Sequence, residues 1–427
     1  MKPSGIEWIG DIPDDWEVTK ISRLYSIQLG KMLQPEKKSS GDTYEPYICA
    51  ANLSSGTFRL DEVKYMWISE PEKDIYRLKR DNLLVTEGGD VGISSIWKDD
   101  ISPCYFQNAL HRVVPKKGNS NKFLHYWLIV LKSVGYIDLI CNKSTIAHFT
   151  KEKFAQSLIL SIPLQTQQKI ADYLDEKCGE IDATIAKQKE SIEKLKAYKQ
   201  SLISETVTKG LDKSAPLKPS GIEWIGDIPS HWEIKKLKFV ANFNQNTLPE
   251  DTDGQFELKY IDIANVSSVD GIKEIQYFNF SNAPSRARRI VKYGDIIVST
   301  VRTYLRAITS IKEDYDNCIC STGFAVITPK DNVQQDFVVY AIENESFIAQ
   351  IIANSQGISY PAINVSQLEN LKLAFPSVKE QKEIVDFLKT KLLEIDSIIN
   401  KKQNIIQKLD TYKKSLIFEY VTGKKYV

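Results

Sequence analysis

At 427 residues the chain is long enough for two or three domains with cores of their own. Its 56 Lys and Arg residues nearly equal its 55 Asp and Glu residues, which excludes a protein that finds nucleic acid through a large overall positive charge. Any nucleic-acid partner would have to meet local basic patches. Six scattered cysteines and four histidines show no metal-type spacing. With no apolar signal region and no run of about 18 apolar residues, we expect a cytoplasmic protein.

The chain contains an internal repeat. The segment Lys2–Pro13, KPSGIEWIGDIP, recurs letter for letter at Lys218–Pro229, and each copy soon leads into a Trp-Glu pair. Weaker matches follow at nearly the same offset, such as Asp81–Thr86 with Asp295–Thr300. A twelve-residue identity is not chance, and the residues in between diverge. A shared framework with different contents predicts two modules that do one kind of job on two different targets.

Within each copy the pattern predicts short strands with few helices. The strands are apolar runs bounded by Gly, Asp or Pro, and the helices are runs of large apolar residues after a polar turn. The expected strands are Asn82–Thr86, Leu110–Val114, Leu158–Pro163, Ile296–Thr300, Phe324–Thr328 and Leu371–Pro376, and the expected helices are Phe123–Leu131 and Phe337–Ile342.

Each copy ends in a long stretch whose apolar residues recur at alternating gaps of four and three, which is the seam of a coiled coil. Gln188 and Lys402 each fill one position of a seam. A helix from about Thr166 to Val207 would be roughly 60 Å long. The predicted interface residues are Leu174, Ile181, Ile185, Ile192, Leu195, Leu202, Leu388, Leu392, Ile395, Ile399, Ile406, Leu409 and Leu416.

Two helices with the same seam in one chain most simply pack on each other. The alternative is that each helix packs on its own module and meets a second copy of the chain. The first interpretation predicts an α+β fold, with two globular α/β modules joined by two long helices in an antiparallel coiled coil. The expected boundaries are 1–162 for the first module, 163–212 for the central helix, 213–375 for the second module and 376–427 for the C-terminal helix.

No catalytic motif is present. The turn Glu87–Gly92 follows an expected strand, but it lacks both the spacing of a dinucleotide loop and a phosphate-binding lysine. No Walker loop, nucleophile elbow or zinc-protease motif occurs. We therefore expect a protein that is not an enzyme, and a divergent nuclease centre has no positive support.

Candidate binding residues lie around the expected strands. Guanidinium groups beside hydroxyls and aromatic rings suit phosphate contacts and guanine edges, and Asn and Gln suit adenine edges. A set of solvated charged loops is the simpler alternative. The predicted DNA-binding residues are Lys79, Arg80, Thr86, Gln107, Asn108, Arg112, Lys143 and Ser144 in the first module and Arg286, Arg288, Arg289, Arg302, Tyr304, Arg306, Gln356 and Tyr360 in the second.

The repeated start motif contains Trp8 and its counterpart Trp224. Residues that are identical in two otherwise different copies are expected to hold the framework. We therefore expect both tryptophans to dock the motif on its module or on a partner subunit.

With these features the chain resembles the DNA-specificity subunit of type I restriction–modification systems. The resemblance rests on the motif GIEWIGDIPxxWE at each module start, and on Gln165–Leu174 and Lys379–Leu388, each followed by an Ile-Asp pair. It covers essentially the whole chain.

The resemblance implies two target recognition domains related by a pseudo-two-fold axis, each reading one half of a split, asymmetric target. Helix length would set the gap between the halves. It also implies two modification subunits that carry S-adenosylmethionine, and two restriction subunits that use ATP and Mg²⁺. No cofactor is expected in this chain. The alternative from another class is a coiled-coil scaffold whose globular domains bind proteins.

Overall fold

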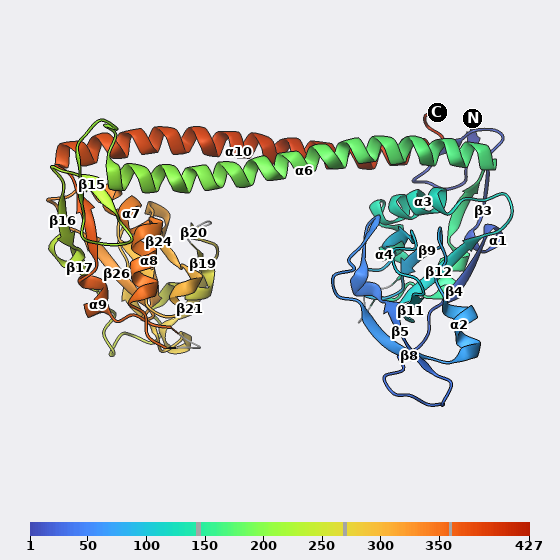
Figure 1. The fold of residues 1–427 in the computed structure, drawn as a ribbon, viewed down its shortest axis with the longest axis horizontal. Coiled ribbons are helices and arrows are strands. Elements are labelled where there is room, and N and C mark those ends of the chain that lie inside the picture. Colours follow the sequence, from blue (N-terminus) through green and yellow to red (C-terminus); the bar gives the residue numbers. More distant parts are fainter. Residues whose placement is uncertain (142–146, 268–270, 358–360) are drawn as a thin grey trace. The chain divides into compact units, whose positions relative to one another are not determined.

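The computed structural model describes residues 1–141, 147–267, 271–357 and 361–427 (Figure 1). The chain forms two compact units, one of residues 1–188 with 403–427 and the other of residues 189–402. The long helices α6 (Leu164–Lys209) and α10 (Val378–Val421) therefore each contribute one stretch to both units. Among the described residues no helix combines the length and the apolar character that crossing a membrane requires.

The first unit is built on a four-stranded antiparallel sheet in the order β10-β9-β12-β4, beside a three-stranded sheet in the order β11-β5-β8. The start motif forms the hairpin β1–β2, and β3 pairs with β13, the last strand of the first module. The strands are β1 (Lys2–Pro3), β2 (Asp11–Ile12), β3 (Glu17–Lys20), β4 (Tyr25–Leu29), β5 (Thr43–Ile48), β6 (Leu53–Ser54), β7 (Thr57–Phe58), β8 (Lys64–Ile68), β9 (Leu83–Thr86), β10 (Ser94–Ile96), β11 (Tyr105–Phe106), β12 (Leu110–Pro115) and β13 (Leu158–Ser161).

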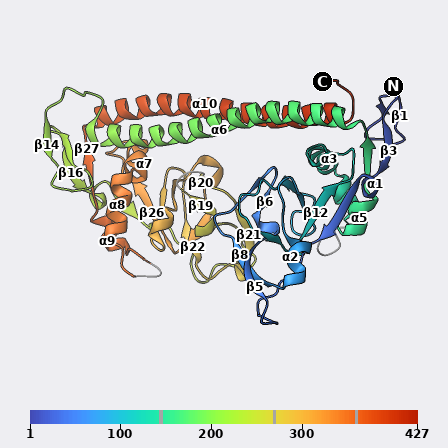
Figure 2. The ribbon, with the colours of Figure 1, turned by 45° about the vertical axis from the view of Figure 1, so that its right-hand side comes forward.

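In the described part of the first module the helical elements are α1 (Ile21–Leu24), η1 (Ala50–Asn52), a 3-10 turn, α2 (Glu70–Tyr76), α3 (Asn121–Ser133), α4 (Tyr136–Ile140) and α5 (Lys151–Gln156). In both views α3 lies between the four-stranded sheet and the long helices (Figures 1 and 2). Its apolar residues are buried in the same core as Leu174 of α6 and Leu416 of α10. The first module and both helix stretches thus share one core, which burial of apolar area holds together.

The second unit repeats this plan with a sheet in the order β17-β26-β23-β24 and another in the order β21-β18-β25-β22. Its strands are β14 (Leu217–Pro219), β15 (Asp227–Pro229), β16 (Glu233–Lys236), β17 (Ala241–Phe243), β18 (Glu257–Ile261), β19 (Val266–Ser267), β20 (Gly271–Ile272), β21 (Gln276–Asn279), β22 (Ala287–Ile290), β23 (Ile296–Ser299), β24 (Ile308–Ser310), β25 (Ile319–Ser321), β26 (Phe324–Pro329) and β27 (Lys372–Phe375). Its other elements are η2 (Leu237–Phe239), η3 (Ile263–Asn265), η4 (Phe280–Asn282), η5 (Thr303–Leu305), η6 (Glu313–Tyr315), α7 (Gln335–Glu343), α8 (Glu345–Ala353) and α9 (Val365–Glu369).

The two long helices run antiparallel in each unit. In the first unit the Lys413 Nζ lies 2.6 Å from an Asp182 carboxylate oxygen, and in the second the Lys199 Nζ lies 2.7 Å from Asp396. Lys413 lies 214 positions after Lys199, and Asp396 lies 214 positions after Asp182. The two bridges are therefore equivalent under the internal repeat. Each bridge joins the helix of one repeat to the helix of the other. The alternative in which each helix packs only on its own module is wrong, and the α+β fold class with paired helices is confirmed.

Most of the predicted seam residues are buried. Leu195, Leu202, Ile406 and Leu409 are half-buried. The buried ones are Leu174, Ile181, Ile185, Ile192, Leu388, Leu392, Ile395, Ile399 and Leu416.

Each long helix is followed within two residues by a glycine that has left-handed backbone and lies against a tryptophan ring. Gly423 has φ +73°, and a Cβ added there would lie 2.6 Å from Pro13 and 2.9 Å from the Trp16 ring. Gly210 has φ +72°, and its Cβ would lie 3.2 Å from the Trp232 ring. Glycine is needed there because it reaches this conformation at little steric cost and leaves room for the ring.

The two start-motif tryptophans differ. The Trp8 ring packs against the rings of Trp127 and Phe418, with centroids 5.8 and 6.5 Å apart. Trp224 is 44% exposed. Docking on the module is confirmed for Trp8, and docking of Trp224 on a partner subunit stays a prediction.

Candidate nucleic-acid interface

In the second module several predicted binding residues gather at one end of the two sheets. Arg302, Tyr304 and Arg306 lie on the turn that follows β23, and Arg286 immediately precedes β22. The backbone segment 322–323 joins these places, because Thr322 N–H donates to the Arg286 carbonyl at 2.8 Å and Gly323 accepts from the N–H of residue 300 at 2.8 Å. We call this group the arginine turn.

The backbone of the arginine turn is held in an uncommon conformation. Arg302 has φ 51° and Arg306 has φ 53°, both in the left-handed region that side chains other than glycine rarely adopt. Between them Thr303 is buried, with its hydroxyl 2.8 Å from the Ser355 hydroxyl. This arrangement leaves Tyr304 52% and Leu305 51% exposed. Such strain persists only where the surroundings impose it, and it is concentrated at functional sites.

Carboxylates orient two of the guanidinium groups. Arg306 Nη1 lies 2.5 Å from Glu345, and Arg286 Nη2 lies 3.0 Å from Asp262. The arginine side chains remain 43% and 56% exposed. They are therefore positioned while donors are still open to a ligand.

The other two predicted arginines of the second module, Arg288 and Arg289, lie on β22. The Arg288 guanidinium lies 4.6 Å from the centroid of the Phe280 ring. Arg289 is half-buried, its Nη1 is buried without a hydrogen-bond partner, and burial lowers its pKa. Gln356 is exposed, and its backbone exchanges hydrogen bonds of 2.8 and 2.9 Å with Ala362.

In the first module the predicted residues fall in two places. Lys79 and Arg80 are exposed just before β9, whereas Gln107 and Asn108 are half-buried just before β12. Because β9 and β12 run antiparallel, the two pairs lie at opposite ends of this strand pair. The first module therefore has no counterpart of the arginine turn made from these four residues.

Two predicted residues of the first module have partners inside it. The Thr86 hydroxyl donates to the Asp90 carbonyl at 2.6 Å, and the side chain is 2% exposed. Arg112 donates to the Arg77 carbonyl at 2.8 Å and to the Gln28 side chain at 2.7 Å. Burial lowers the pKa of Arg112. Lys143, Ser144 and Tyr360 lie outside the described residues.

Arg80 also borders a pocket of about 600 Å³ in the first unit. Its lining pairs cations with acids, since Lys122 lies 2.8 Å from Asp175 and Lys413 bridges Asp182. His125 also lines the pocket, and burial lowers its pKa to about 4, so it is neutral near pH 7. The pocket lining therefore carries both positive and negative charges and is not a purely basic site for an anion. Within the described part of the chain no three His, Cys, Asp or Glu side chains are grouped to hold a metal ion.

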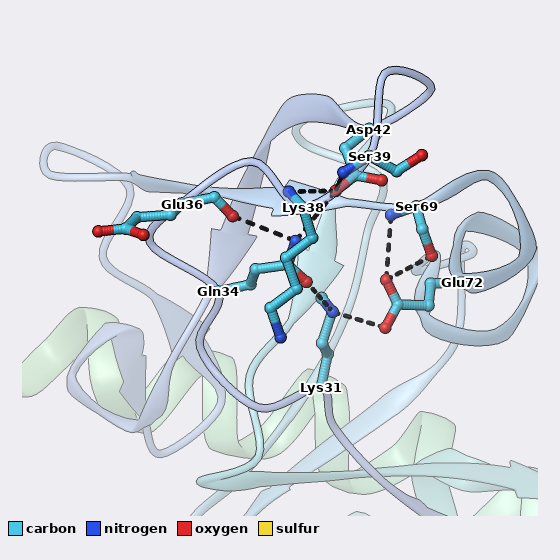
Figure 3. Close-up of polar contacts among 8 residues, drawn as sticks. All are labelled: Lys31, Gln34, Glu36, Lys38, Ser39, Asp42, Ser69 and Glu72. Carbon is cyan, nitrogen blue, oxygen red and sulfur yellow. Dashed lines mark hydrogen bonds and ion pairs between the residues drawn. The ribbon is translucent and has the colours of Figure 1, made fainter.

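A polar network around Lys31 was not predicted. Figure 3 shows the Lys31 ammonium between Gln34 and Glu72, with Asp42 beyond Gln34. Lysine is seldom buried, so the sequence around Lys31 gave no reason to expect that its charge lies inside the module. Only Gly30 gives a hint, because an added Cβ would lie 2.3 Å from the Gln107 carbonyl oxygen.

Comparison with known proteins decides the family. A family model described as the type I restriction modification DNA specificity domain matches residues 13–196 and again residues 229–408, which together make up most of the chain. The chain belongs to the type I restriction–modification DNA specificity family. Each repeat carries one specificity domain with part of its long helix.

Relatives over nearly the full length agree. The type I restriction enzyme MjaVIII specificity subunit of Methanocaldococcus jannaschii is 24% identical over 423 residues, which cover 97% of this chain and 93% of that one. The EcoBI specificity subunit of Escherichia coli is 23% identical over 364 residues, covering 82% of this chain and 74% of the relative. This specificity subunit is therefore a DNA-binding member of a restriction–modification complex, and it is not an enzyme.

Solved structures show the same fold. A chain from a type I restriction–modification system, solved for its complex assembly and conformational transition, has a TM-score of 0.71 at 13% identity and covers 97% of this chain and all of its own length. The HsdS subunit of Thermoanaerobacter tengcongensis has a TM-score of 0.53 at 14% identity, covering 97% of this chain and 98% of the other.

Proposed function

We propose that each module of this specificity subunit reads one half of a split, asymmetric DNA target, and that the paired helices set the spacer. The observation that carries this proposal is the repeat itself. The two modules share a start motif, strand plan and helix, but the residues around their strand ends differ. The second module has the arginine turn, whereas the first has Gln107 and Asn108. Different donors and acceptors recognise different base edges, so the two half-sites should differ.

Within the second module the arginine turn is the proposed reading surface. Half-exposed arginines held by carboxylates suit phosphates and guanine edges, and the neighbouring Tyr304 offers an exposed aromatic ring. Arg289 is excluded from this surface because its Nη1 is buried inside the module. In the first module Arg80, Lys79, Gln107 and Asn108 remain the proposed contacts. Thr86 and Arg112 are excluded there because their polar groups are engaged inside the module.

The remaining partners follow from the family resemblance. We infer two modification subunits docked on the helices and two restriction subunits in the complete assembly. S-adenosylmethionine, ATP and Mg²⁺ would act on those subunits, and this chain would hold none of them. The assembly would work in the cytoplasm.

The test starts from the full-length chain with its modification subunits. Mapping methylated adenines in DNA exposed to this complex gives the target. Arg302→Ala or Arg306→Ala should then weaken binding to a target duplex by about 1–3 kcal/mol for a lost base contact. Arg289→Ala is the matched control in the same module and should leave the sequence preference unchanged. Unaltered affinity for both turn variants would refute this reading surface.

A protein-binding scaffold remains the competing function. Binding to duplex DNA that falls steeply as salt rises favours DNA contact, because released counterions drive it. A complex that shows no DNA affinity even at low salt would instead support the scaffold. Mg²⁺-dependent cutting by the isolated chain is not expected.

A further inference from the structure

One loop of the first module is unusual for a surface segment. Between β4 and β5, residues 32–41 are exposed except for Gln34, and even Met32 and Leu33 are left at the surface, 75% and 50% exposed. Such a segment has no apolar core to hold it, so it would ordinarily be mobile. Here the flanking residues Lys31 and Asp42 are buried together with Gln34, at 6%, 5% and 7% exposure.

These three side chains form one continuous network that crosses the base of the loop (Figure 3). Lys31 Nζ donates to Gln34 Oε1 at 3.0 Å, and Gln34 Nε2 donates to Asp42 Oδ2 at 3.1 Å. The same Asp42 oxygen accepts the backbone N–H groups of Lys38 and Ser39 at 3.0 and 3.1 Å. Those hydrogen bonds lower the pKa of Asp42, so the carboxylate is ionised at neutral pH.

The network is anchored to the rest of the module at two points. Lys31 Nζ lies 2.5 Å from Glu72, which also accepts the Ser69 N–H at 3.0 Å and thereby caps α2. The backbone carbonyl of Gln34 accepts the backbone N–H of Trp67 at 3.0 Å. Burying a lysine costs desolvation energy, which the bonds from Lys31 to Gln34 and Glu72 offset only when the loop is in this conformation. The loop is therefore set in place before any partner arrives.

The fixed loop carries exposed cations, and its base adjoins a pair of the proposed reading residues. Lys37 and Lys38 are exposed, and Lys37 Nζ lies 5.3 Å from the centroid of the Trp67 ring. At the base of the loop the Lys31 carbonyl accepts the Asn108 N–H at 2.9 Å. The loop thus starts at the Gln107–Asn108 turn, one of the two places proposed above for base contacts.

We propose that residues 32–41 form a prearranged DNA-contacting loop in which Lys37 and Lys38 bind phosphates of the half-site read by the first module. Lys31 is its positioning residue. This inference rests on the proposed function, because it assumes that the first module lies on DNA. The buried Lys31 ammonium does not itself reach the DNA and acts only through the loop.

Salt dependence separates these roles. The full-length chain with its modification subunits is titrated with a duplex carrying the mapped target at several salt concentrations. Each lost phosphate contact lowers the slope of log K against log salt by about 0.9. Lys37→Ser/Lys38→Ser should therefore reduce the slope by about 1.8. Lys20→Ser/Lys117→Ser removes two exposed charges elsewhere on the module and should leave the slope unchanged.

Lys31→Met gives the decisive comparison, because it removes a buried charge and leaves both surface lysines in place. If Lys31 positions the loop, Lys31→Met should reduce the salt slope as much as Lys37→Ser/Lys38→Ser does. Combining all three substitutions should then reduce the slope no further. A structural role alone would lower the melting temperature without changing the slope. Asp42→Asn, at the other end of the network, should behave like Lys31→Met and covers the case in which Lys31→Met does not fold.

The outcomes also separate the two proposals. A wild-type complex without salt-dependent DNA binding would overturn the proposed function and this loop with it. A normal wild-type slope that Lys37→Ser/Lys38→Ser leaves unchanged would overturn the loop alone. Loss of the modification subunits from that variant, with an unchanged slope, would make the loop a protein contact and would equally refute the proposal.

Discussion

At the scale of single residues, one carboxyl makes the stability of the protein depend on pH. It belongs to Glu343, the last residue of α7. Burial raises the pKa of its carboxyl to about 7, although Lys199 and Lys312 partly offset the effect. A carboxyl whose pKa is higher in the folded state favours folding while it is protonated. That contribution is present at acid pH and is lost as the pH rises through 7.

Glu343→Gln should therefore stabilise the protein at pH 8. The amide resembles the protonated acid, so the gain is at most about 3 kcal/mol at pH 8 and vanishes near pH 4. Thermal unfolding of both proteins across this range measures it. Glu274→Gln changes an exposed carboxylate of the same unit and should give no pH-dependent difference. A gain at pH 8 that persists at pH 4 would contradict the assigned cause.

At the scale of elements, the ends of the long helices are the sensitive points. Gly423→Ala places a side chain on left-handed backbone and against the rigid Pro13 and Trp16 rings. The backbone conformation alone costs about 1–2 kcal/mol, and the contact adds to it. The first unit should unfold at a lower temperature, which calorimetry or hydrogen exchange of α10 would detect.

Gly179→Ala is the matched control within α6. This glycine has ordinary helical backbone, and an added Cβ meets nothing within 4 Å. Alanine should raise stability there by roughly 0.5–1 kcal/mol. Equal stabilities for wild type and Gly423→Ala would show that the helix end is not packed as described.

Elements were also where sequence reasoning succeeded. The expected runs Leu110–Val114 and Phe324–Thr328 are strands β12 and β26, because an apolar run bounded by turn residues leaves few alternatives. The long helices were predicted from their apolar residues at alternating gaps of four and three. The binding residues were harder to predict from the sequence, because the partners of a side chain depend on tertiary contacts. Nothing local distinguishes the engaged Arg112 from the exposed Arg80, or the packed Trp8 from the exposed Trp224.

At the scale of the whole molecule, the repeat makes a prediction about half of the chain. Residues 1–213 contain both Asp182 and Lys199. In the full chain Asp182 pairs with Lys413, the repeat-equivalent of Lys199, and Lys199 pairs with Asp396, the repeat-equivalent of Asp182. Two copies of this half can therefore form both bridges and bury both seams. We expect it to be a dimer at micromolar concentration by light scattering.

Two variants test the contact in this half-chain. Ile181→Asp places a charge in the buried seam and should give a monomer, because an unpaired charge is costly to bury. Tyr198→Asp alters a residue of the same helix that is 57% exposed and should leave the dimer intact. A folded half-chain that stays monomeric at tens of micromolar would refute the prediction.

The crossed Asp–Lys bridges also bear on how such a protein can change over generations. Each bridge takes one residue from either repeat, so a change in one copy of the helix must be tolerated by the other. A substitution in one module does not require a matching substitution in the other, because each module has strands and a core of its own. After duplication the helices are constrained as a pair while each module is free to acquire new contents. A lineage can thus exchange one module for a foreign one without having to reinvent the connection.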